Sequence, residues 1–171
     1  DQNGCVGGQA TTGLVGPFMT CYDAQNKKMV IRGIFEEVVA RMKTLGGAVD
    51  PADVEAEEPF SGFYKIGHAH VGPFDHECFK LVCTQMLAES GAKLLLHTQF
   101  IDVLQENGRI TGVVAANKSG LFLFRAKVVI DCSGDADVAA RSGVKFELGR
   151  VEDGNMQPAT LFFRVGNVDT P

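Results

Sequence analysis

The chain has 171 residues, of which 45% are hydrophobic, and its 16 Lys and Arg against 21 Asp and Glu give a formal net charge of −5 at pH 7. This hydrophobic content supports a folded core and excludes a mainly disordered chain. The longest basic cluster is the pair Lys27 and Lys28, so nucleic acid and anionic membrane surfaces are poor partners, and no apolar run approaches the roughly 18 residues of a membrane span.

The ends of the chain predict that it is part of a longer protein, and the cysteines predict the cellular compartment. The chain starts at Asp1 rather than Met and stops at Pro171 just after a strand-like run, so we expect an excised piece, from which a leader could have been removed. Its five cysteines are odd in number and include no C-x-x-C pair; Cys78 and Cys83 are five residues apart. The pattern favours reduced, mostly buried thiols in a cytoplasmic protein over a disulfide framework or a zinc site.

The first part of the chain predicts a loop and then a helix. Residues 1–23 are rich in Gly, Thr and small residues and predict a loop with at most one short helix. Residues 31–45 predict a helix that Gly46 and Gly47 end. Residues 48–73 predict an exposed excursion, with short strands possible at 62–66. The apolar stripe of the helix has spacings of three and four: Ile31, Ile34, Phe35, Val38, Val39, Met42 and Leu45.

A second helix is predicted to follow Pro73 and to end near Gly91. Asp75 is a good N-cap, and Phe74 before it is a possible staple partner of Phe79. The apolar run at 93–99 predicts a short strand, so that helix and strand together form the second half of a βαβ unit. The inward-facing residues of this helix are Cys78, Phe79, Val82, Met86 and Leu87.

Residues 100–126 predict a three-stranded antiparallel meander. Its first turn is Asn107-Gly108, a strong type I′ signal. The run at 126–132 then predicts a strand that returns to the main sheet, followed by a helix at 135–142. A loop at 144–158 precedes a final strand at 159–169.

These elements together predict an α/β fold, a partial Rossmann-like domain with an inserted three-stranded meander. We place this domain at residues 1–144, with the meander at 100–126, and the start of a second, substrate domain at 145–171. The phosphate-binding G-x-G-x-x-G is not present, because the glycines of Gly4-Cys5-Val6-Gly7-Gly8 have the wrong spacing and no strand before them. The loop that would hold a pyrophosphate is therefore missing or lies upstream of Asp1.

Five short motifs nevertheless occur in an order that resembles the FAD-dependent oxidoreductases, specifically the flavoproteins related to fumarate reductase and heterodisulfide reductase. The motifs are CVGGQATTGLVGPF at 5–18, RGIFEEV at 32–38, PFDHE at 73–77, VVIDCSGDADVAARSG at 128–143 and QPATLFFR at 157–164. The resemblance implies FAD as cofactor of the intact protein. It also implies that Gly7, Gly8, Gln9, Ala10 and Thr11 line the flavin half of FAD, although without it Gly7-Gly8 reads as a flexible turn.

The same resemblance places the turn Cys132-Ser133-Gly134-Asp135 against the cofactor, at the carboxyl end of the last sheet strand. Ser133, Gly134 and Asp135 are thus cofactor-binding candidates. Asp135 is suited to accept a hydrogen bond from a ribityl or ribose hydroxyl, to cap the helix at 135–142, or to do both. Asp137 more simply complements the helix dipole.

The remaining polar residues are weaker candidates. His68 and His70 share a strand face, but a substrate-facing or solvated loop is favoured over metal binding. His76 is expected to be exposed and His97 to be a core or edge residue. Three residues near the predicted domain junction are substrate-site candidates: Gln157, Thr160 and Arg164, the last favoured slightly as a plain surface residue.

The sequence thus predicts part of an FAD-dependent oxidoreductase that transfers hydride or electrons to a small-molecule substrate, with an unknown electron partner. The catalytic acid and base cannot be named, because sequence does not give their geometry. The alternative is a non-catalytic α/β module that binds a ligand or partner, in which the Gly-Gly and Ser-Gly-Asp turns are purely structural.

Overall fold

The computed structural model describes residues 1–54 and 70–169, and these divide into two compact units. One unit comprises residues 5–94, and the other comprises residues 1–4 with 95–171. The elements in chain order are η1 (Gly8–Ala10), α1 (Ile34–Thr44), η2 (Pro51–Asp53), α2 (His76–Glu89), β1 (Gln99–Glu106), β2 (Arg109–Asn117), β3 (Gly120–Arg125) and α3 (Asp137–Arg141). The possible strands at 62–66 and His68 lie outside the described residues.

Helix α1 confirms the predicted helix, but its apolar stripe is only partly covered. Val38, Val39 and Met42 are buried, whereas Ile34 is 76% exposed and Leu45 is 56% exposed. Among the described elements of its unit, α1 packs mainly against helix α2. A single neighbour covers a narrow stripe, so the residues at both ends of the predicted face remain outside the core.

Helix α2 begins as the sequence predicts. The Asp75 carboxylate accepts a hydrogen bond from the Cys78 backbone N–H at 2.7 Å, and Phe74 contacts Phe79 with ring centroids 5.5 Å apart. The N-cap and the hydrophobic staple are therefore both confirmed. Val82, from the predicted inward face, is fully buried.

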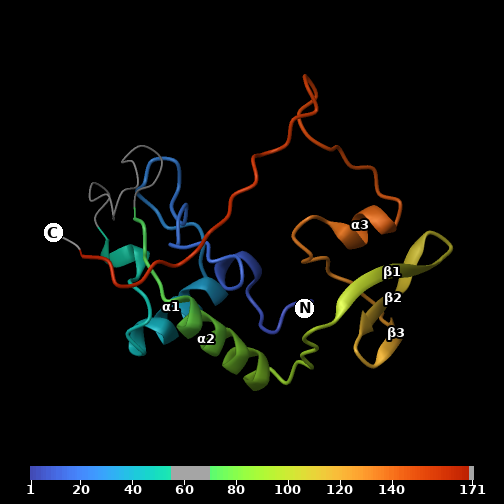
Figure 1. Ribbon diagram of the computed structural model, residues 1–171, viewed down its shortest axis with the longest axis horizontal. Helices are drawn as coiled ribbons and strands as arrows, with labels where there is room; N and C mark the ends of the chain where they lie inside the picture. Colours follow the sequence, from blue (N-terminus) through green and yellow to red (C-terminus); the bar gives the residue numbers. More distant parts are fainter. Residues whose placement is uncertain (55–69, 170–171) are drawn as a thin grey trace. The chain divides into compact units, whose positions relative to one another are not determined.

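The core of this unit lies between α1 and α2, which run side by side (Figure 1). Val38, Met42 and Val82 form its buried centre. Aromatic side chains extend it: the Phe18 ring stacks on Phe74 with centroids 4.2 Å apart. At the surface the ion pair of Arg41 with Glu89 joins the two helices, and Arg41 also pairs with Glu37 on its own helix. The hydrogen bonds from Arg41 to Glu89 and Glu37 raise the Arg41 pKa further above its usual range.

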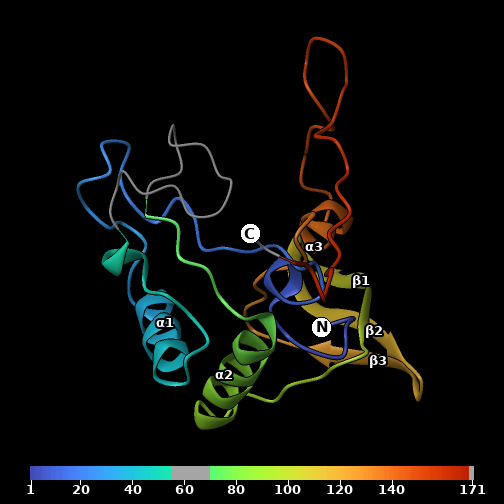
Figure 2. The ribbon, with the colours of Figure 1, turned by 60° about the vertical axis from the view of Figure 1, so that its left-hand side comes forward.

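The predicted meander is confirmed as a three-stranded antiparallel sheet of order β1-β2-β3 (Figure 2). Its first turn has positive φ at both central residues, 52° at Asn107 and 73° at Gly108. Two positive φ values define the type I′ turn, whose twist matches that of the paired strands. The short helix α3 contacts β1 in the same unit.

Three other predicted strands are wrong. Residues 93–98 are irregular, with β1 beginning at Gln99, and residues 126–132 and 159–169 contain no strand. Apolar side chains in the last two runs are exposed: Ile130 is 82% exposed and Leu161 is 86% exposed. An apolar run becomes a buried strand only beside other strands, and among the described residues no strand pairs with these runs.

Helix α3 is shorter than the predicted helix at 135–142, and Asp135 is not its N-cap. The N-cap position is Ala136, in the left-handed conformation with φ of 59° and no side-chain cap bond. The backbone N–H groups of α3 are instead satisfied from further back in the chain, by side chains at 131 and 133. In the described part of the chain no helix is both long and apolar enough to cross a bilayer.

Candidate functional site

The first predicted cofactor segment, residues 7–11, forms a tight turn around a buried threonine. Gly7 has a φ of 105°, and a Cβ added there would lie 2.6 Å from the Thr11 Cγ2 atom. Thr11 is fully buried, and its hydroxyl donates to the Val6 carbonyl oxygen at 2.9 Å. Glycine at position 7 is thus required by both the backbone conformation and the packing of Thr11. The Thr11 side chain shapes the turn from within.

The outer side of the same turn presents backbone donors. Gly8 and Gln9 are exposed, and their N–H groups open the 3₁₀ helix η1, where no intrahelical acceptor precedes them. No atom lies within 4 Å of the position that a Cβ would take at Gly8. The side-chain position of Gly8 is therefore open, which lets a ligand approach the backbone from that side.

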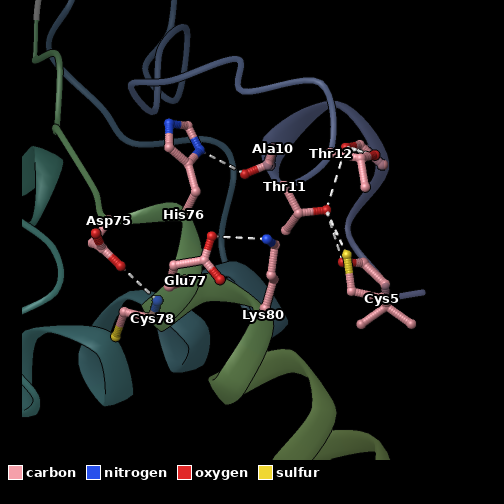
Figure 3. A network of polar contacts seen from close by, with 11 residues as sticks. Cys5, Ala10, Thr11, Thr12, Asp75, His76, Glu77, Cys78 and Lys80 are labelled. Carbon is pink, nitrogen blue, oxygen red and sulfur yellow. Dashed lines mark hydrogen bonds and ion pairs between the residues drawn. The ribbon is translucent and has the colours of Figure 1, made fainter. Parts of the chain in front are cut away.

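The N-terminal turn of α2 contacts this segment through His76. The His76 Nδ1 atom lies 2.9 Å from the Ala10 carbonyl oxygen, and Figure 3 shows the ring directed at that carbonyl. The expectation that His76 is exposed is wrong, since the side chain is half-buried. One turn further on, the Lys80 ammonium pairs with the Glu77 carboxylate at 2.8 Å. The loop and the helix start thus form one polar network.

The second predicted cofactor segment, residues 133–135, is organised by Asp131. The Asp131 carboxylate accepts hydrogen bonds from the Ser133 hydroxyl at 2.7 Å, the Ser133 N–H at 3.0 Å and the Ala139 N–H at 2.9 Å. These bonds, that of the Ser133 hydroxyl first, lower the Asp131 pKa below its ordinary value. The Ser133 hydroxyl in turn accepts from the Asp137 N–H at 2.8 Å. Ser133 is thereby committed to the turn.

Gly134 and Asp135 remain available at the tip of that turn. Gly134 has a φ of 97° and nothing within 4 Å of an added Cβ. Asp135 is exposed, and within the described chain its carboxylate has no hydrogen-bond partner. Sequence reasoning missed the organising role of Asp131, although the Asp-x-Ser spacing is a known signal for a turn closed by a side chain.

The structure therefore brings the predicted site residues together as two local groups. Residues 7–11 belong to the unit of residues 5–94, and residues 133–135 belong to the other unit. Each group is a turn that exposes a glycine backbone, and one hydroxyl side chain, Thr11 or Ser133, is hydrogen-bonded within the turn. The exposed candidates are Gly7, Gly8 and Gln9 in the first group, and Ser133, Gly134 and Asp135 in the second.

Two histidines differ from expectation. His70 does not lie on a strand: its φ is 56°, and its ring stacks on Tyr22 with centroids 3.8 Å apart. Its Nδ1 and Nε2 atoms face the carbonyl oxygens of Val54 and Asn26 at 2.6 and 3.2 Å, so both ring nitrogens lie against backbone oxygens. His97 is exposed, and not in a core or at a strand edge.

Other candidates lie on open surface. His97 borders a shallow hollow of about 480 Å³ whose lining is mostly amide side chains: Gln2, Asn3, Gln99 and Asn117, with Ala116. The junction candidates Gln157, Thr160 and Arg164 are exposed in irregular chain. All five cysteines are free, and burial raises the pKa of the Cys21 and Cys83 thiols.

Comparison with known proteins gives the family. A family model described as FAD dependent oxidoreductase matches residues 1–171. No curated protein and no solved structure matches the chain significantly. The family match spans both turns described above, the one at 7–11 and the one at 131–135. The chain belongs to the FAD-dependent oxidoreductase family.

Proposed function

We propose that this protein is a flavoprotein that transfers hydride or electrons between FAD and a small-molecule substrate. The observation that carries the proposal is the family match over residues 1–171, because FAD is the cofactor of that family. Within the family, the five ordered motifs favour the flavoproteins related to fumarate reductase and heterodisulfide reductase.

Each of the two exposed turns, taken by itself, offers hydrogen-bonding groups that suit FAD. The N–H groups of Gly8 and Gln9 are free donors on an open backbone, and Gly134 offers a second open backbone beside the Asp135 carboxylate. Backbone N–H donors such as those of Gly8 and Gln9 suit flavin or phosphate oxygens, and a carboxylate such as that of Asp135 suits a ribityl or ribose hydroxyl. The buried Thr11 and the bonded Ser133 hold these turns in shape, while Gly7 and Ala10 complete the first turn.

When bound, the flavin supplies hydride transfer at its N5 atom, and the protein positions and tunes the ring. A pyrophosphate also needs a glycine-rich loop, and no G-x-G-x-x-G occurs in these 171 residues. We propose that a glycine loop outside them completes the site. Residues 1–144 then form part of a Rossmann-like domain in which the meander is an insertion, and residues 145–171 open a substrate domain.

The test is whether the full-length native protein holds flavin. Purified protein, as isolated and after reconstitution with FAD, is expected to show the flavin absorption bands in the visible range with one FAD for each chain. Full-length protein that retains no flavin after reconstitution would contradict the oxidoreductase proposal and favour a non-catalytic module. The cytoplasmic location that the cysteine pattern of the sequence favours is tested separately, by fractionating the source cells.

The isolated 171-residue chain gives the opposite expectation. Because its residues include no phosphate-binding glycine loop, we expect it to bind FAD weakly or not at all. The measurement is the absorbance of the purified chain after incubation with FAD and removal of free cofactor. Tight, stoichiometric yellow flavin on this chain alone would contradict the requirement for an outside loop.

A further inference from the structure

We propose that His76 is a positioning residue for the cofactor, and that it acts by holding the Ala10 carbonyl and with it the turn of residues 7–11. The inference rests on the proposed function, since it assigns this turn to FAD. It adds a residue outside both predicted cofactor segments, on the first turn of α2. The carrying observation is the contact of 2.9 Å between His76 Nδ1 and the Ala10 oxygen, drawn in Figure 3.

The chemistry of this contact makes His76 Nδ1 the donor. A carbonyl oxygen only accepts hydrogen bonds, so His76 Nδ1 carries the proton and donates it. The other ring nitrogen, Nε2, has no hydrogen-bond partner in the described part of the chain. The ring is also held by packing: its plane meets Phe74 edge-on, with centroids 5.0 Å apart at 70°.

The backbone of His76 is itself well fixed. It is the first residue of α2, directly after the Asp75 N-cap, and the staple of Phe74 and Phe79 sets the direction of entry. Gly16 lies close to the ring, because a Cβ there would be 3.2 Å from the His76 Cε1 atom. A donor anchored on three sides in this way constrains what it bonds to.

The orientation of the Ala10 carbonyl determines whether the turn of residues 7–11 is closed. Its oxygen and the Thr11 N–H belong to one planar peptide unit, so they can turn only together. The Thr11 N–H donates to the Gly8 carbonyl oxygen at 3.1 Å, which closes the turn that exposes the Gly8 and Gln9 donors. By holding one side of this peptide, His76 keeps the other side in the bond that closes the turn.

The test compares three substitutions at His76 in the full-length protein. His76→Leu removes the hydrogen-bond donor and replaces the ring with an apolar side chain of similar size. His76→Asn places an amide N–H where Nδ1 stands, whereas His76→Gln places it nearer the Nε2 position, so Asn is expected to rescue and Gln is not. His97→Leu, at an exposed histidine without such a contact, is the matched control.

The readout is the dissociation constant of FAD from the apoprotein, followed by flavin fluorescence, together with the visible spectrum of the bound flavin. His76→Leu and His76→Gln are expected to bind FAD roughly two- to tenfold more weakly, as the loss of one hydrogen bond implies. His76→Asn is expected within about twofold of wild type, with an unaltered spectrum. Thermal melting of the apoproteins separates this effect from a general loss of folding.

Several results would overturn the assignment. They are an unchanged FAD affinity and spectrum in His76→Leu, an equal loss in His76→Asn and His76→Leu, or an equal loss in the control. If His76→Leu does not fold, the contrast between Asn and Gln decides in its place. A wild-type apoprotein that fails to bind FAD would overturn the proposed function as well, whereas normal wild-type binding with normal His76→Leu binding overturns the positioning role alone.

Discussion

Helix α1 offers a direct measure of how much tertiary packing adds to a helical pattern. Met42 is fully buried between α1 and α2, in contact with the cluster that includes Val38 and Val82. In Met42→Ala the core loses three heavy atoms of a side chain with no exposed surface. The transfer term and the cavity left behind together predict a loss of about 2–5 kcal/mol in the free energy of opening of this unit.

Ile34 on the same helix is the matched control. Periodicity alone assigns Ile34 and Met42 to one apolar stripe, yet Ile34 is 76% exposed. Ile34→Ala removes a similar apolar side chain from solvent rather than from a core. The expected change in that free energy is within about 0.5 kcal/mol, because the side chain is exposed and alanine is the better helix former.

The assay is hydrogen exchange of the α1 amide groups in the full-length protein, because it reports the opening free energy of one unit separately from the rest. Protection is expected to fall strongly in Met42→Ala and to stay near wild type in Ile34→Ala. Equal losses for the two variants would show that the predicted stripe is buried along its whole length. A loss below about 1 kcal/mol for Met42→Ala would show that this core readily closes the cavity.

Three further changes test local features of the two units. Asp75→Ala is expected to lower the stability of α2 by about 1 kcal/mol, because the Cys78 N–H loses its acceptor, whereas Asp75→Asn is expected to retain most of that stability. Urea denaturation measures the stability of both variants. Gly47→Ala is expected to cost about 1–3 kcal/mol in the same assay, because its Cβ would lie 2.3 Å from the Cys78 sulfur, and a wild-type midpoint would contradict that contact. Because the pKa of Asp131 is lowered in the folded state, its stabilising effect is present above the unfolded-state pKa near 3.8 and is lost as pH falls through the folded-state pKa. The stability difference between wild type and Asp131→Asn is therefore expected to vanish in acid. A difference that persists at low pH would assign the stabilising effect to another group.

The candidate site was predicted in part. The residues of both turns could be named from the ordered motifs, but the motifs did not show which residues shape the turn and which are exposed. Thr11, named as a cofactor contact, is buried with its hydroxyl bonded to Val6, and Ser133 is bonded on both sides. The sequence predicts an exposed His76, and it could not show the bond to Ala10, because that bond joins positions 66 residues apart. No local pattern encodes a contact of that separation.

Local chemistry by itself determined several elements of this protein. The N-cap and staple of α2, the Asn107-Gly108 turn and the strands on either side of it depend on neighbouring residues, and each formed where the sequence predicted. Their energies come from hydrogen bonds and backbone preferences within a few positions, so a short window of sequence contains the necessary information.

The tertiary structure decided which apolar segments became buried. The runs at 93–98, 126–132 and 159–169 read as strands, yet none pairs with another strand among the described residues. On α1 it likewise separated Met42 from Ile34. Burial and strand pairing require a partner surface from elsewhere in the fold, and a one-dimensional pattern shows that a segment is apolar without showing what covers it.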